Sequence, residues 1–260
     1  MRLSPRWIYP RHNVALSNAQ MGDYAAAEAA YLEARKLSPR AYFLAYNLGM
    51  LYQQLNRLKD AERLLNEAAA LEPSRPEALN GLGLVFAAAG KINAAEAKYK
   101  AALALDSAFG PARHNLALLL WGSAKRRTEA LTIWRQLVTD QPGLAAARAA
   151  LADALLEQGD ADGARSQYAY LLKERPGSLS ARLALAECHL RARAWADAEA
   201  VLVVGGAQHP AVEEKLADVR AAAGRIGEAR AAYVSLEAKS PDPGARRRLQ
   251  TKIKVLRGAA

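Results

Sequence analysis

Residues 82–99 read LGLVFAAAGKINAAEAKY and contain the pattern that decides the fold. Ala95 is followed four residues later by the bulky Tyr99, and this pairing recurs along the chain at steps of 34, 34, 35, 34, 34 and 31 residues. The pairs are Ala27/Tyr31, Ala61/Leu65, Ala95/Tyr99, Ala130/Trp134, Ala164/Tyr168, Ala198/Leu202 and Ala229/Tyr233. A period of this length indicates an array of similar structural units.

Two further ladders run in phase with the first. An aliphatic residue followed by Ala or Gly occurs at Val14-Ala15, Leu48-Gly49, Leu82-Gly83, Leu116-Ala117, Leu151-Ala152, Leu185-Ala186 and Leu216-Ala217. The units close with Pro39, Pro73, Pro142, Pro176, Pro210 and Pro241, and Ser107 replaces the expected proline once. Apolar residues at helical spacing on both sides of a turn predict two helices in each unit.

The turn between the two helices carries residues that tolerate a left-handed backbone. They are Gly22, Asn56, Gly90, Gly159 and Gly224, as expected where a helix ends in that conformation. Arg193 stands at the corresponding place in the sixth unit, which predicts a strained or differently closed turn.

The period and the order of small, bulky and proline positions resemble the tetratricopeptide repeat (TPR) family, whose unit is two antiparallel helices. The resemblance implies an all-α fold, a right-handed α-solenoid (superhelix) of stacked antiparallel helix pairs. We assign seven repeats at 8–41, 42–75, 76–109, 110–144, 145–178, 179–209 and 210–243, with the tail of a truncated or degenerate preceding repeat at 1–7 and a basic capping helix at 244–260.

Two repeats depart from the regular length. The repeat 110–144 has one extra residue in its turn, between Gly122 and Arg127. The spacing from Ala198 to Leu216 is 18 residues against 21 at the equivalent places, and we place the loss of three residues after Pro210, so that the first helix of the last repeat should start short. The pair Gly205-Gly206 should weaken the end of the helix before it.

The two ends of the array differ. Leu3-Ser4-Pro5-Arg6 repeats Leu37-Ser38-Pro39-Arg40, which favours a piece cut from a longer protein over a natural start with a degenerate half-repeat. The helix face around Val14 and Ala15 is then uncovered and open to self-association. At the other end, Leu249, Ile253 and Leu256 share one face of a helix and should pack on the last repeat.

Composition limits the function further. No stretch approaches the roughly 20 apolar residues of a membrane span, and the single cysteine, Cys188, excludes an internal disulfide and is expected to be buried. The histidines are far apart in sequence and no catalytic or phosphate-binding motif is present, so we expect no metal, no cofactor and no enzymatic activity. Cytoplasmic location is expected, or periplasmic or membrane-tethered location if the start was trimmed, and the Ala- and Arg-rich composition favours a bacterial source.

The net charge of +10 raises the question of nucleic acid. The last 17 residues supply six basic residues and no acidic one, namely Arg246, Arg247, Arg248, Lys252, Lys254 and Arg257. The repeats are near charge balance, so a nucleic-acid or acidic-membrane contact through this end and Lys125 to Arg127 is the least favoured reading.

The resemblance also implies a binding surface. In TPR proteins, positions 2, 5, 6, 9, 12 and 13 of the first helix line a concave groove that holds extended peptides or partner helices, counting the first residue of each repeat as position 1. The first four repeats carry amides and aromatics there, and we predict ligand-binding residues at Tyr9, His12, Asn13, Phe43, Tyr46, Asn47, Gln54, Asn80, His114, Asn115 and Trp121. The last three repeats carry acids, at Asp153, Glu157, Glu187, Glu214 and Asp218.

Position 6 is asparagine in three of the first four repeats, at Asn13, Asn47 and Asn115. A side-chain amide can both donate to and accept from a peptide backbone of any sequence, and the series resembles the asparagine ladder in the TPR arm of the O-linked N-acetylglucosamine transferases. The alternative is that these asparagines tie one repeat to the next. Chaperone-binding TPRs need a lysine at position 5, where this chain has none, so a carboxylate clamp is not expected.

The function predicted from the sequence is a protein- or peptide-binding TPR scaffold or adaptor that uses the groove of its N-terminal half. The alternative is a regulatory or substrate-delivery arm of a larger enzyme whose catalytic domain lies outside this chain.

Overall fold

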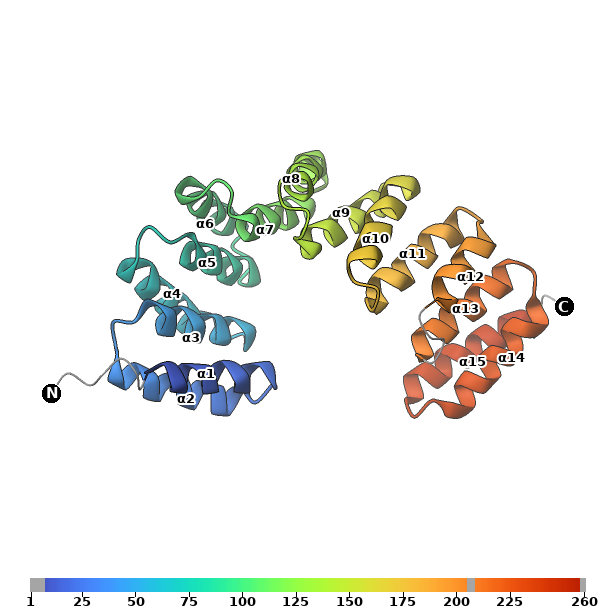
Figure 1. The fold of residues 1–260 in the computed structure, drawn as a ribbon, viewed down its shortest axis with the longest axis horizontal. Coiled ribbons are helices and arrows are strands. Elements are labelled where there is room, and N and C mark those ends of the chain that lie inside the picture. Colours follow the sequence, from blue (N-terminus) through green and yellow to red (C-terminus); the bar gives the residue numbers. More distant parts are fainter. Residues whose placement is uncertain (1–7, 205–208, 258–260) are drawn as a thin grey trace. The chain divides into compact units, whose positions relative to one another are not determined.

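The computed structural model describes residues 8–204 and 209–257, which form helices joined by short turns (Figure 1). They belong to two compact parts, 1–137 and 138–260, which we call the N-terminal part and the C-terminal part. The N-terminal part holds α1 (Ile8–Gln20), α2 (Tyr24–Leu37), α3 (Tyr42–Gln54), α4 (Leu58–Leu71), α5 (Pro76–Ala88), α6 (Ile92–Leu105), α7 (Gly110–Trp121), the 3₁₀ helix η2 (Ala124–Arg126) and most of α8 (Arg127–Asp140).

The C-terminal part holds α9 (Ala145–Glu157), α10 (Ala161–Glu174), α11 (Leu179–Arg191), α12 (Trp195–Val203), α13 (Pro210–Ala222), α14 (Ile226–Lys239) and α15 (Pro243–Arg257). No strand occurs in the described residues, and within each part consecutive helices pack side by side, for example α3 with α4 and α13 with α14. The prediction of an all-α fold of stacked helix pairs is therefore confirmed. The segment Leu3-Ser4-Pro5-Arg6 and the pair Gly205-Gly206 lie outside the described residues.

The small and bulky ladders meet in the core. Every alanine of the first ladder is fully buried, and so are bulky partners such as Tyr99 and Trp134. A Cβ placed on Gly83 would lie 2.3 Å from Cε1 of Tyr99, so only glycine leaves room for this ring. Each buried bulky side chain contributes about 1.5–3 kcal/mol by leaving water.

The turns adopt the expected left-handed backbone. The φ angles are 82° at Gly22, 73° at Gly90, 88° at Gly159 and 80° at Gly224, and Asn56 has a φ of 58°. Arg193 closes its turn in the same way, with a φ of 57°. The predicted strain is confirmed, because this conformation is unfavourable by about 1–2 kcal/mol for a residue that carries a Cβ.

One length prediction is confirmed and the other is wrong. The extra residue of the fourth repeat is taken up by η2, which lies within the interval from Gly122 to Arg127. In contrast, α13 begins at Pro210 and has 13 residues, as many as α11, whereas α12 has only 9 and ends at Val203. The shortening falls on the helix before Pro210, because proline is favoured at the first position of a helix, where no N–H is needed.

At three places among the described residues, the arginine directly before the second helix of a repeat bridges to the preceding repeat. Nη1 of Arg57 donates to both carboxylate oxygens of Glu28, at 2.9 Å each, and Nη2 donates to Asp60 at 3.0 Å. The same positions are used by Arg126 with Glu96 and Glu129, and by Arg225 with Glu199 and Glu228. Each bridge links the second helices of neighbouring repeats, and hydrogen bonds from Arg126 lower the pKa of Glu96 to about 2.

The last helix packs as predicted. Leu249 and Ile253 of α15 are buried together with Tyr233 and Leu236 of α14, and Leu256 lies against the same cluster. Arg248 and Lys252 add ion pairs to Glu214 of α13, with N–O distances of 2.8 and 2.9 Å.

The first helix is only partly uncovered. Val14 is 53% exposed, whereas Leu48 at the same position of the next repeat is 1% exposed. The prediction that Ala15 is uncovered is wrong, because Ala15 is fully buried against Ala27 and Tyr31. Self-association through this face stays a prediction.

Candidate ligand-binding face

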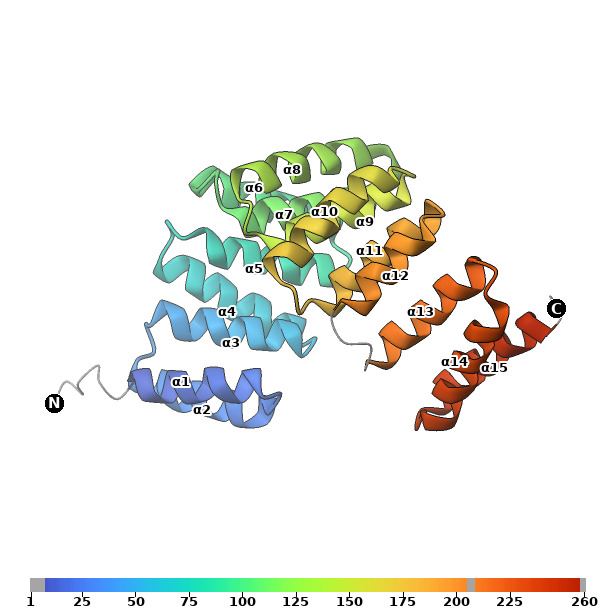
Figure 2. The ribbon, with the colours of Figure 1, turned by 45° about the vertical axis from the view of Figure 1, so that its right-hand side comes forward.

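The first helices of the repeats in the N-terminal part, α1, α3, α5 and α7, lie next to one another. The close neighbours α3 and α5 are joined by packing, as are α5 and α7 (Figure 1, Figure 2). Side chains of α1 reach α3, where Tyr9 meets Phe43. We call positions 2, 5, 6, 9, 12 and 13 of these four helices the inner positions, and the surface that they form the inner face.

Three aromatic rings join α1 to α3. Tyr9 stacks on Phe43 with 5.8 Å between the ring centroids and 7° between the planes, and His12 meets Phe43 edge-on at 4.9 Å. Tyr9 is 57% exposed, so its ring offers an anchoring surface to a ligand. Burial lowers the pKa of His12, which favours the neutral imidazole at pH 7.

Two tyrosines and a carboxylate meet between α3 and α5. Tyr42 and Tyr46 stack with their ring centroids 5.8 Å apart. The guanidinium carbon of Arg75 lies 4.9 Å from the centroid of the Tyr42 ring, and its Nη1 is 4.0 Å from Oε1 of Glu77. Burial, followed by the charge of Glu77, raises the pKa of both tyrosines.

Sequence reasoning named only Tyr46 from this group. Glu77 could have been found from the sequence, because it is the one charged residue at the inner positions of the first four repeats. Tyr42 could not have been found in this way, because it stands at position 1 of its repeat, outside the inner positions.

The four predicted asparagines fall into two kinds. Asn115 Nδ2 donates to Asn80 Oδ1 at 2.9 Å, and Asn80 is only 6% exposed. Asn13 is exposed and Asn47 half-buried, and the amides of these two make no hydrogen bond within the described residues. The side-chain amides of Asn13 and Asn47 therefore keep their full hydrogen-bonding capacity for a ligand. Asn80 and Asn115 already use part of their capacity in the bond to each other.

His114 and Trp121 are held by the core. Trp134 Nε1 donates to His114 Nδ1 at 3.2 Å, and the rings of Trp121 and Trp134 are 5.9 Å apart. Burial lowers the pKa of His114, which agrees with its role as an acceptor at Nδ1. The guanidinium of Arg127 lies 4.7 Å over the Trp121 ring. These two side chains are positioned by packing, although both remain half-exposed.

Gln54, the remaining predicted residue, lies at the end of α3. Its Nε2 donates to the hydroxyl of Tyr24 at 2.9 Å. The side chain thus faces the neighbouring helix α2 and is exposed.

The acidic residues of the C-terminal part are already paired. Lys252 contacts Glu214 and Asp218, with N–O distances of 2.9 and 2.6 Å, and Lys215 contacts Glu187 at 3.1 Å. Asp153 accepts a hydrogen bond from the hydroxyl of Tyr168. These carboxylates offer less negative charge to a ligand than the sequence alone indicates.

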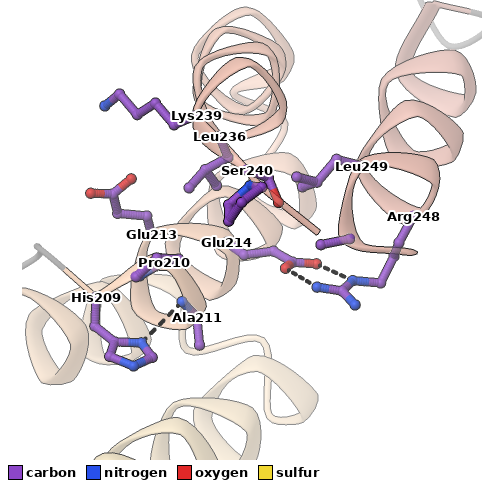
Figure 3. A pocket seen from close by; sticks show the side chains of 12 residues that line it. His209, Pro210, Ala211, Glu213, Glu214, Leu236, Lys239, Ser240, Arg248 and Leu249 are labelled. Carbon is purple, nitrogen blue, oxygen red and sulfur yellow. Dashed lines mark hydrogen bonds and ion pairs between the residues drawn. The ribbon is translucent and has the colours of Figure 1, made fainter. Parts of the chain in front are cut away.

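A pocket of about 590 Å³ lies where α13, α14 and α15 meet. Its walls include the apolar Leu236 and Leu249, and Figure 3 shows the carboxylate of Glu214 bonded to the guanidinium of Arg248 beside them. Sequence reasoning did not foresee the pocket, because it depends on how α15 is set against the repeat before it.

The described residues contain no cluster of three or more His, Cys, Asp or Glu side chains suited to a metal ion. None of the described helices combines the length and the apolar character that a bilayer crossing requires. Cys188 is buried, as predicted, and burial raises the pKa of its thiol.

Three models of the tetratricopeptide repeat match the sequence. One matches residues 10–40, the second matches 46–108 and 114–178, and the third matches 155–214. A comparison with curated proteins gave no match.

Solved structures agree in fold. A tetratricopeptide repeat protein from Parabacteroides merdae is 16% identical, with 96% of this chain and 98% of that chain covered and a TM-score of 0.58. A thermophilic TPR protein of Thermus thermophilus is 21% identical, with coverages of 70% and 99% and a TM-score of 0.63. PilF of Pseudomonas aeruginosa is 20% identical, with coverages of 81% and 97% and a TM-score of 0.64.

Proposed function

Because the chain belongs to the tetratricopeptide repeat family, we propose that it is a scaffold or adaptor that binds an extended peptide, or a segment of a partner protein, on the inner face of its N-terminal part. Repeat arrays of this kind generally serve as binding surfaces. The proposal concerns binding and assigns no catalytic step to the chain.

The observation that carries the proposal is the state of Asn13 and Asn47. Their amides share position 6 of adjacent repeats and make no hydrogen bond within the described residues. An extended peptide presents unpaired N–H and C=O groups, which such amides can satisfy whatever the peptide's sequence. Tyr9 and Phe43 lie on the same helices and supply an apolar anchor beside them.

The test uses a library of acetylated and amidated nonapeptides and measures binding by fluorescence polarisation. If each amide contributes about 0.5–1.5 kcal/mol, the Asn13→Ala/Asn47→Ala double variant should bind the selected peptides roughly 5- to 150-fold more weakly. The matched control is Asn66→Ala/Asn93→Ala, which removes two exposed asparagines of α4 and α6, away from the inner face.

Unchanged affinity in the Asn13→Ala/Asn47→Ala variant, with its helicity intact, would contradict the proposal. So would an equal loss in the control, since that would point to a general effect on the array.

A further inference from the structure

We propose that the group formed by Tyr42, Tyr46 and Glu77 receives one cationic side chain, Arg or Lys, of an otherwise uncharged bound segment. The inference rests on the proposed function and specifies the chemistry of the peptide that the inner face selects. Three independent observations support it.

The first observation is the charge of the surroundings. Glu77 is the single formal charge among the inner positions of α1, α3, α5 and α7. Among the described residues, Arg75 is the one cation within ion-pair distance of Glu77, but the Nε of Arg75 is engaged by Glu72, and its Nη1 stays 4.0 Å from Glu77. Two carboxylates therefore share one guanidinium, and the group keeps one unit of negative charge. A bound cation would neutralise it, whereas a bound carboxylate would be repelled.

The second observation is that two buried polar atoms lack a hydrogen-bond partner within the described residues. Oε2 of Glu77 and the hydroxyl of Tyr42 are buried, and neither has a hydrogen-bond partner within the described residues. Tyr42 as a whole is only 6% exposed. A buried carboxylate oxygen without a donor is unfavourable, and an ammonium or guanidinium group brings several donors and no acceptor.

The third observation is the aromatic stack. Cations bind the faces of aromatic rings within about 6 Å of the centroid. The guanidinium of Arg75 already does this at Tyr42, with its carbon 4.9 Å from the ring centroid. Tyr46 stacks on Tyr42 and is half-exposed, so its ring extends the same surface toward the inner face.

The experiment compares an arginine peptide with its citrulline counterpart, which has nearly the same shape without the charge. Nonapeptides with Arg, Lys, norleucine, Gln or Glu fixed at each position are screened against the wild-type chain, and the best arginine peptide and its citrulline form are titrated by fluorescence polarisation. We expect Arg and Lys to be enriched at one position and the arginine form to bind roughly tenfold more tightly, as for a hydrogen bond to a charged group.

Glu77→Gln should remove the difference in affinity between the arginine and citrulline forms and leave the affinity for the citrulline form unchanged. Glu33→Gln, which removes the same charge from an exposed site of α2, should preserve the difference. Tyr46→Leu should reduce it several-fold, and this variant decides the question if Glu77→Gln does not fold.

Peptides that bind without enrichment of Arg or Lys would overturn the inference, as would a tenfold preference that survives both Glu77→Gln and Tyr46→Leu. The proposed function fails on different evidence: no nonapeptide binds, or the loss of Asn13 and Asn47 has no effect.

Discussion

The amide of Asn115 in α7 donates to Oδ1 of Asn80 in α5 at 2.9 Å, across 35 residues of sequence. This bond ties two neighbouring repeats together. Asn13 and Asn47 have the same position in their repeats as Asn115 but no such partner among the described residues. The two interpretations of the position 6 asparagines thus apply to different residues. Asn115 ties one repeat to the next, whereas the amides of Asn13 and Asn47 are free among the described residues.

Asn115→Ala should destabilise the chain, because it leaves the buried Asn80 without its partner. The expected loss is about 1–2 kcal/mol in the free energy of unfolding, measured by urea denaturation. Asn47→Ala should change it by less than about 0.5 kcal/mol. Equal losses in the two variants would show that the position 6 amides share one structural role.

Arg126→Ala should lower the urea midpoint, because Arg126 links Glu96 to Glu129 and removing it leaves Glu96, whose side chain is 16% exposed, without that partner. Arg63→Ala removes an exposed arginine with no such bridge and serves as the control. A double-mutant cycle with Glu96→Gln should give a favourable coupling between the two side chains. A coupling of zero would mean that the bridge adds nothing to stability.

Arg193→Gly should stabilise the chain. Glycine relieves the left-handed strain of about 1–2 kcal/mol but loses roughly 0.5–1 kcal/mol through its freer unfolded state. The expected net gain is about 0.5–1 kcal/mol by thermal or urea denaturation. Asn56→Gly should stabilise the chain less, because asparagine tolerates the left-handed conformation better than arginine does. A larger gain in stability for Asn56→Gly than for Arg193→Gly would contradict this explanation.

Leu249→Ala should destabilise the C-terminal part by about 2 kcal/mol or more, because Leu249 is 3% exposed within the cluster that joins α15 to α14. Val255→Ala, at a residue of the same helix that is 66% exposed, should be nearly neutral. Hydrogen exchange should locate the effect in α13, α14 and α15. An unchanged exchange pattern would show that α15 does not stabilise the repeat before it.

Stability should fall as the pH drops below about 6.5. Burial lowers the pKa of His12, His114 and His189, so the unfolded chain takes up protons first and gains stability relative to the folded chain in this window. His114→Gln should reduce the fall between pH 6.5 and 5, since an amide oxygen can still accept from Trp134 but does not titrate. A wild-type stability that is flat over this range would refute the assignment.

A second loss should follow below about pH 4.5. The pKa values of Glu96 and Glu214 are lowered to about 2, chiefly by hydrogen bonds from Arg126 and Arg248, so protonation favours the unfolded chain there.

The helix pairs, the left-handed turns and the terminal helix could be predicted because each depends on residues at fixed spacing along the chain. The start of α13 could not, because proline at the same spacing either follows one helix or begins the next. Pro39 lies after α2 has ended at Leu37, whereas Pro210 is the first residue of α13. Only the backbone distinguishes these two uses.

The inner face could be predicted in outline, because helical spacing alone places position 6 on one side of the first helix. Helical spacing does not show which of these side chains already bond to other residues of the chain. That Asn115 bonds to Asn80, and that Lys252 neutralises Asp218, depends on distances between repeats. The Tyr42–Tyr46 stack beside Glu77 was missed for the same reason.

The close fit of Gly83 to Tyr99 has a consequence for how such an array evolves. The two residues lie on different helices of one repeat, and a methyl group on the first would collide with the ring of the second. Other repeats combine a tyrosine with Ala at the place of Gly83, as in Ala15 with Tyr31, so this close approach is particular to the third repeat. Recombination that exchanges whole helix pairs preserves the match of Gly83 to Tyr99, whereas a crossover inside this pair that brings Ala to position 83 places a methyl group against the ring. Exchange at the loops between repeats therefore leaves this contact intact.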